Sequence, residues 1–141
     1  MTFEQLMREH DEIDAHTRRL EECCAVQAPA IAEVVAARGA LRIALEEHLA
    51  HEDEALFGRL MTANRASAEA VHAFAAEFGQ LRADWGAYLS DWSAAWLADD
   101  WDGFRQETAA LMSRMRDRTR QETELLYPLA LRTAAIGLRA A

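Results

Sequence analysis

Four long stretches of this sequence repeat apolar residues at steps of three and four, with only short breaks between them. They cover residues 3–26, 30–61, 68–97 and 104–136. Such steps place apolar side chains on one face of a helix. Only 6 Gly and 2 Pro occur in 141 residues, so little interrupts helices of this length. Because long helices with tight connections bury their apolar faces by packing antiparallel, the pattern predicts an all-α, up-down-up-down four-helix bundle in one domain, residues 1–141.

The composition supports helices and limits the classes of partner. Alanine supplies much of the 51% hydrophobic content, which favours helix over sheet. The net charge of −9 repels nucleic-acid phosphates and anionic lipid, so we expect no nucleic-acid partner. No stretch approaches the roughly 18 apolar residues of a membrane span, and the N-terminal residues lack the order of a signal peptide. We therefore expect a cytoplasmic protein without a membrane partner.

The two cysteines are adjacent in the sequence. A disulfide between Cys23 and Cys24 would be strained and would close almost no loop. We interpret both as small buried residues near a helix end.

Histidines lie in the amphipathic parts of the first three predicted helices. His10 shares the stripe of Leu6, Ile13 and Thr17, whereas His16 faces largely away from it. In the second helix His48 and Glu52 are one turn apart on the same face, a spacing that can chelate one metal ion. Bundle interiors build metal sites from such side chains on facing helices.

The fourth predicted helix repeats the register of the second. Glu52 is followed by Leu56, Phe57 and the helix breaker Gly58, and Glu122 is followed in the same way by Leu126, Tyr127 and Pro128. This repetition indicates that the two helices are pseudo-equivalent and that Glu122 is the counterpart of Glu52.

Over nearly the whole chain, this arrangement resembles the hemerythrin-like, or HHE cation-binding, domains. These are non-haem iron proteins with a four-helix bundle, in which histidines and bridging glutamates hold two iron atoms. The resemblance implies a non-haem iron site whose metal ligands are His10, His48, Glu52, His72 and Glu122. Mixed imidazole and carboxylate ligands suit iron, and the same set would accept manganese or zinc.

One position departs from the family pattern. Four residues before Glu122, where the family has its last histidine, this chain has Arg118. A guanidinium stays protonated and cannot ligate a metal. Three states are compatible with this: a di-metal site with a water or a substitute ligand, a mononuclear site of His10, His48, Glu52 and Glu122, or no metal. Arg118 could pair with Glu52 or Glu122, or it could extend out of the bundle.

Other side chains could in principle replace the missing ligand. His51 lies on the side of His48 away from a second metal, so we interpret it as a boundary histidine bonded to a neighbouring helix or to water. Tyr88, Glu77 and Asp14 are further oxygen donors, each a weaker candidate than His51.

Aromatic residues gather at one end of the predicted bundle. We expect this cluster to form end-of-bundle core, with a partner surface or a homodimer interface as the alternative. Its tryptophans are Trp85, Trp92, Trp96 and Trp101.

The function that these features favour is that of a bacterial-type hemerythrin-like protein with an altered iron site. Such a protein would bind or sense O₂, NO, peroxide or the redox state of its metal. The alternative is a metal-deficient interaction module that docks on a protein partner. Arg118 and the acidic surface favour this alternative. A di-iron oxidase or peroxidase ranks last, because no acid, base or substrate access is identifiable.

Overall fold

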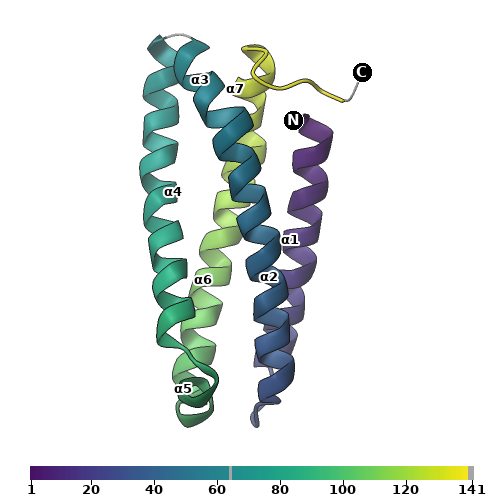
Figure 1. Ribbon diagram of the computed structural model, residues 1–141, viewed down its shortest axis with the longest axis vertical. Helices are drawn as coiled ribbons and strands as arrows, with labels where there is room; N and C mark the ends of the chain where they lie inside the picture. Colours follow the sequence, from purple (N-terminus) through teal and green to yellow (C-terminus); the bar gives the residue numbers. More distant parts are fainter. Residues whose placement is uncertain (64, 140–141) are drawn as a thin grey trace.

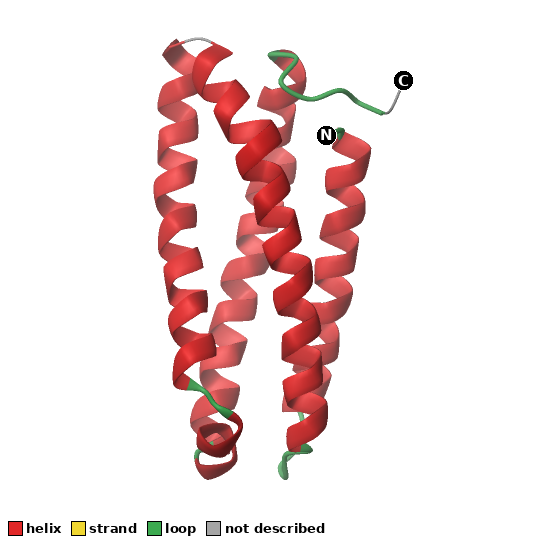
Figure 2. Ribbon diagram, viewed as in Figure 1, coloured by secondary structure: helices red, strands yellow, loops and turns green. Residues whose placement is uncertain are grey.

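The computed structural model describes residues 1–63 and 65–139. Within this part of the chain every regular element is helical, which confirms the all-α fold class (Figure 2). The elements are α1 (Phe3–Cys24), α2 (Ile31–Glu52), the π-helical η1 (Asp53–Phe57), α3 (Gly58–Ala63), α4 (Arg65–Asp91), α5 (Ala94–Asp99), α6 (Trp101–Gln121), the π-helical η2 (Glu122–Leu126) and α7 (Tyr127–Arg132).

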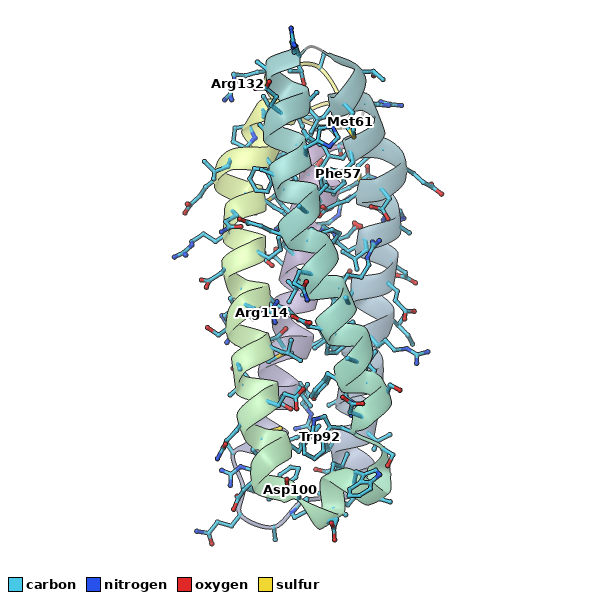
Figure 3. All side chains as sticks on the ribbon, turned by 90° about the vertical axis from the view of Figure 1, so that its left-hand side faces the viewer. Phe57, Met61, Trp92, Asp100, Arg114 and Arg132 are labelled. Carbon is cyan, nitrogen blue, oxygen red and sulfur yellow. The ribbon has the colours of Figure 1, made fainter. Side chains whose placement is uncertain are left out.

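The long helices α1, α2, α4 and α6 lie side by side, and each runs opposite to the one before it (Figure 1). The short helices α3 and α7 lie at the end of the molecule that holds the N-terminus, and α5 lies at the other end. Figure 3 shows Phe57 and Met61 toward the first end and Trp92 and Asp100 toward the second. No described helix has the length and apolarity needed to cross a membrane.

Side chains fix the points at which several helices begin. At the start of α1, Thr2 and Gln5 form a reciprocal capping box, in which the Gln5 backbone N–H donates to Thr2 Oγ1 over 3.2 Å. At the start of α6, the Gly103 backbone N–H donates to Asp100 Oδ1 over 3.0 Å. These caps satisfy backbone donors that have no partner within the helix.

The chain contains more helical segments than the sequence predicts. The second and fourth predicted stretches each pass through a five-residue π-helical segment, η1 and η2, before continuing as α3 and α7. Pro128 is the second residue of α7, one position after Tyr127, and it has no N–H to donate to the preceding turn. The third predicted stretch divides into α4 and α5, and the last helix begins at Trp101 rather than at residue 104.

Two apolar clusters fill the interior, one toward each end. The cluster at the α5 end contains Trp85, Tyr88, Phe104 and both cysteines, whereas the other contains Leu6, Leu56 and Leu126. Trp85 and Trp101 are buried, as expected for core residues, but Trp96 is 62% exposed. Cys23 and Cys24 are free and buried, which confirms their predicted role. His10, which is buried, comes between Leu6 of one cluster and Ile13 of the other along α1.

Candidate metal centre

Four buried side chains meet between the two apolar clusters. They are His10 from α1, His48 and Glu52 from α2, and Glu122 from the start of η2. One possible ligand atom from each lies within 4.8 Å of the other three. None of the four residues is more than 4% exposed. This is the mononuclear set that the sequence left open.

The helical register explains why these four side chains converge. Leu6, His10, Ile13 and Thr17 follow one another at steps of three and four on α1, and all are buried. His48 and Glu52 are one turn apart on α2 and therefore share a face. Each residue thus continues the inward face of its own helix.

The two imidazoles bind the same carboxylate oxygen. His10 Nε2 lies 2.8 Å from Glu122 Oε1, and His48 Nε2 lies 3.2 Å from it. His48 Nε2 also contacts Glu52 Oε1. The imidazole nitrogens and carboxylate oxygens therefore point to one small volume, as ligands of a single cation do.

Tyr127 completes this group, although the sequence pattern did not identify it as a site residue. Its hydroxyl lies 3.1 Å from both Glu52 Oε1 and Glu122 Oε1 and can donate to either carboxylate. It also lies 2.8 Å from His10 Nε2. Tyr127 follows Glu122 by five residues, and the η2 turn, in which the Tyr127 N–H bonds to the Glu122 carbonyl, brings them together. Regular α-helical spacing would not place the two on one face.

Burial and mutual contact shift the acidities of this group. Burial alone would lower the pKa of His48, but hydrogen bonds to Glu122 and Glu52 outweigh burial and raise it to about 11. Burial and the charge of Glu122 raise the pKa of Glu52 to about 7. Burial would also raise the pKa of Glu122, yet hydrogen bonds with His10 and His48 hold it well below its ordinary range.

A family model described as the hemerythrin HHE cation-binding domain matches residues 1–130. The chain belongs to this hemerythrin family. The match confirms the resemblance drawn from the histidine and glutamate spacing. Neither a curated protein nor a solved structure gives a significant match.

Arg118 points into this HHE domain rather than out of it. The residue is 7% exposed, and its Nε donates to Glu122 Oε2 over 2.7 Å. Its Nη1 donates to the Phe74 carbonyl over 3.1 Å, and its guanidinium carbon lies 4.1 Å from the centroid of the Phe78 ring. The sequence left open whether Arg118 pairs with a buried glutamate or extends out of the bundle. The structure shows that it pairs with Glu122.

His72, the fifth residue of the ligand set implied by the family resemblance, does not reach the other four. It is exposed on α4, whereas Val71, Phe78, Trp85 and Tyr88 are buried. These four follow helical spacing, and His72 comes one residue, or about 100°, after Val71. The apolar stripe of α4 thus turns His72 outward, a signal that was present in the sequence.

His51 is a boundary histidine, as expected. Its side chain is half exposed, and its Nδ1 lies 2.5 Å from Glu9 Oε1 on α1. The other oxygen of Glu9 lies 3.6 Å from His48 Nδ1. Glu9 thus lies beside His48 at the edge of the cluster, a neighbour that the sequence pattern did not identify.

The three weaker oxygen donors lie outside the centre. Tyr88 shares a hydrogen bond with Thr108 over 2.7 Å, and Asp14 pairs with Arg18 over 3.0 Å. Glu77 is exposed on α4. In the described part of the chain, the group of histidines and carboxylates that could hold a metal ion consists of His10, His48, Glu52 and Glu122.

Proposed function

We propose that this protein is a cytoplasmic hemerythrin-like four-helix bundle that holds one non-haem metal ion, iron by family, and binds or senses O₂, NO, peroxide or the redox state of the metal. The observation that carries the proposal is the convergence of two histidines and two glutamates, all buried, within 4.8 Å. Two imidazoles and two carboxylates suit iron, with manganese and zinc as further candidates.

One metal fits these residues better than two. The carboxylate oxygen of Glu122 that faces away from the histidines already binds Arg118, whose charge is permanent. His72 is exposed, so it supplies no nitrogen for a second ion. We therefore infer that the Arg118 guanidinium occupies the place of a second cation.

The surrounding residues would hold and orient the ligands. The Tyr127 hydroxyl can donate to Glu52 Oε1 or to Glu122 Oε1. This hydrogen bond would orient a carboxylate that could bind the metal. Glu9 lies beside His48 Nδ1 and would set the orientation of that ring. A bound iron would supply an open coordination position or a change of oxidation state. The protein supplies a buried site in which the four side chains already converge.

Metal analysis of the untagged protein, purified without chelator, tests this proposal. We expect about one ion per chain, and sharply less in His48→Ala and Glu52→Ala. His72→Ala is the matched control and should retain the full metal content. Two ions per chain, or equal loss in all three variants, would contradict the mononuclear assignment.

A second candidate function is that of a metal-free interaction module, because the buried charges of the cluster already neutralise one another. Glu122 pairs with both His10 and Arg118, so the buried carboxylate has partners even without a metal. A metal-deficient module of this kind would act by docking on a protein partner or on a second copy, and exposed Trp96 is a candidate contact. A folded protein that takes up no iron, manganese or zinc would favour this function.

A further inference from the structure

A small cavity lies among the helices beside the candidate metal centre. Its volume is about 30 Å³, and residues of α1, α2, α4, α6 and η2 line it, among them His48 and Glu122 of the four-residue cluster. Most of its walls are apolar and include Ile13, Leu49 and Met115. Roughly 10–15 Å³ is enough for one water, so the cavity has room for a ligand of two or three heavy atoms.

Two buried nitrogen donors belong to residues that line this cavity. They are Trp85 Nε1 and Arg118 Nη2, on side chains that are at least nine-tenths buried. Within the described part of the chain, neither atom has a hydrogen-bond partner. Buried N–H groups almost always have an acceptor, because leaving one without a partner is costly. Two such donors on the walls of one cavity therefore point to a ligand with lone pairs.

Trp85 differs in this respect from two other tryptophans. Trp92 Nε1 donates to Glu107 over 2.6 Å, and Trp101 Nε1 donates to the Val26 carbonyl over 2.9 Å. The remaining nitrogens of Arg118 also have acceptors, namely Glu122 and the Phe74 carbonyl. His48, which also lines the cavity, has a third buried nitrogen without a partner, Nδ1. In the described part of the chain, the buried side-chain nitrogens that lack a partner thus all belong to residues of the cavity wall.

We propose that this cavity is a binding site for a small, weakly hydrated hydrogen-bond acceptor of two or three heavy atoms, held by Trp85 Nε1 and Arg118 Nη2. Apolar walls with a few polar groups are typical of pockets that select small ligands. The size excludes sulfate and phosphate. Neither donor belongs to the four-residue cluster, but His48 and Glu122 of that cluster also line the cavity, so the site adjoins the candidate metal centre. The two donors themselves require no metal, and in this respect the site goes beyond the proposed function.

Azide is a suitable probe, because it is a linear triatomic acceptor whose infrared band lies where proteins absorb little. The band is titrated with the full-length protein as purified and again after chelation. We expect a saturable bound band in both forms. Trp85→Phe keeps the aromatic ring but removes one donor and should weaken azide binding about tenfold.

Two further variants make the result specific. Trp92→Phe also removes an indole N–H, but outside the cavity, and should bind azide as the unmodified protein does. Met115→Phe reduces the cavity without removing a donor and should also weaken binding. The proposal is overturned by absence of saturable binding, by equal weakening in Trp85→Phe and Trp92→Phe, or by binding that needs the metal and is unchanged in Trp85→Phe.

Discussion

Arg118 is the residue that most distinguishes this domain from the family pattern. It places a permanent positive charge against a buried carboxylate, where the family has a neutral imidazole. The guanidinium is held from three sides, by Glu122, by the Phe74 carbonyl and by the Phe78 ring. Such a residue contributes to the structure of the centre, and under the mononuclear proposal it would also limit the number of metal ions.

Replacement of Arg118 by methionine should destabilise the metal-free protein by about 3–5 kcal/mol, because Glu122 would lose a buried partner. The loss should be smaller in metal-loaded protein, since the ion also neutralises Glu122. Chemical denaturation of both forms measures this difference. Arg114→Met is the control: Arg114 pairs with Asp84 at the surface over 2.8 Å, and its loss should change stability little. Equal losses at Arg118 and Arg114 would contradict the structural role of Arg118.

Cys24 should be an unreactive thiol at neutral pH. Burial raises its pKa to about 11, and the thiolate is the reactive form. We expect Cys24 in a Cys23→Ser variant to react very slowly with iodoacetamide at pH 8 and faster as the pH rises toward 11. The unfolded protein should react readily at pH 8. Fast labelling of the folded protein at pH 8 would show that the thiol is more accessible than the structure indicates.

At the scale of elements, the π-helical segments matter most for the site. η1 follows Glu52 directly and η2 begins with Glu122, so each of the two carboxylates lies where a helix changes its winding. π-helical turns inside α-helices are often found at functional sites. In η2 the altered winding has a direct effect, because it brings Tyr127 to the carboxylates.

The start of α6 gives a prediction about its cap. A Cβ at Gly103 would clash with the Asp100 carboxylate that caps the helix, whereas a Cβ at Gly79 in α4 has open space around it. Gly79→Ala should therefore stabilise the protein by about 0.5–1 kcal/mol through helix propensity. Gly103→Ala should be about 1 kcal/mol less stable than Gly79→Ala, because the cap is displaced. Thermal unfolding compares them, and equal gains would contradict the cap assignment.

At the scale of the whole molecule, the candidate centre joins segments that are far apart in the sequence. His10 and Glu122 are 112 residues apart, and α2 supplies the other two side chains. A metal bound here would link α1, α2 and η2 in the folded state only. Binding and folding should therefore be coupled.

Metal should raise the free energy of unfolding according to its concentration. A ligand that binds only the folded state at 100 times its Kd adds about 2.7 kcal/mol. Denaturation in increasing concentrations of Mn²⁺ or Zn²⁺ should show this increase, and Glu52→Ala should not show it. If both proteins are stabilised equally, the ion binds elsewhere on the surface.

The helical fold class and much of the site could be predicted from the amino-acid sequence alone. Periodic apolar residues define the inward face of each helix, and that face carries His10, His48, Glu52 and Glu122. Spacing within one helix is a local property, so it can be read without knowing the neighbours. The family resemblance supplied the expectation of a metal, and it also supplied His72, which the apolar stripe of α4 turns outward.

Three features depend on how the chain folds and packs: the direction of Arg118, the presence of Tyr127 at the carboxylates and the cavity beside them. A long side chain at a helix face can turn inward or outward, and the Phe74 carbonyl and the Phe78 ring on another helix settle this choice. The position of the Tyr127 hydroxyl depends on the π-helical turn of η2. The spacing of apolar residues does not predict such a turn. The cavity exists only between packed helices, because its walls come from several elements whose distances and rotations are fixed by packing against one another.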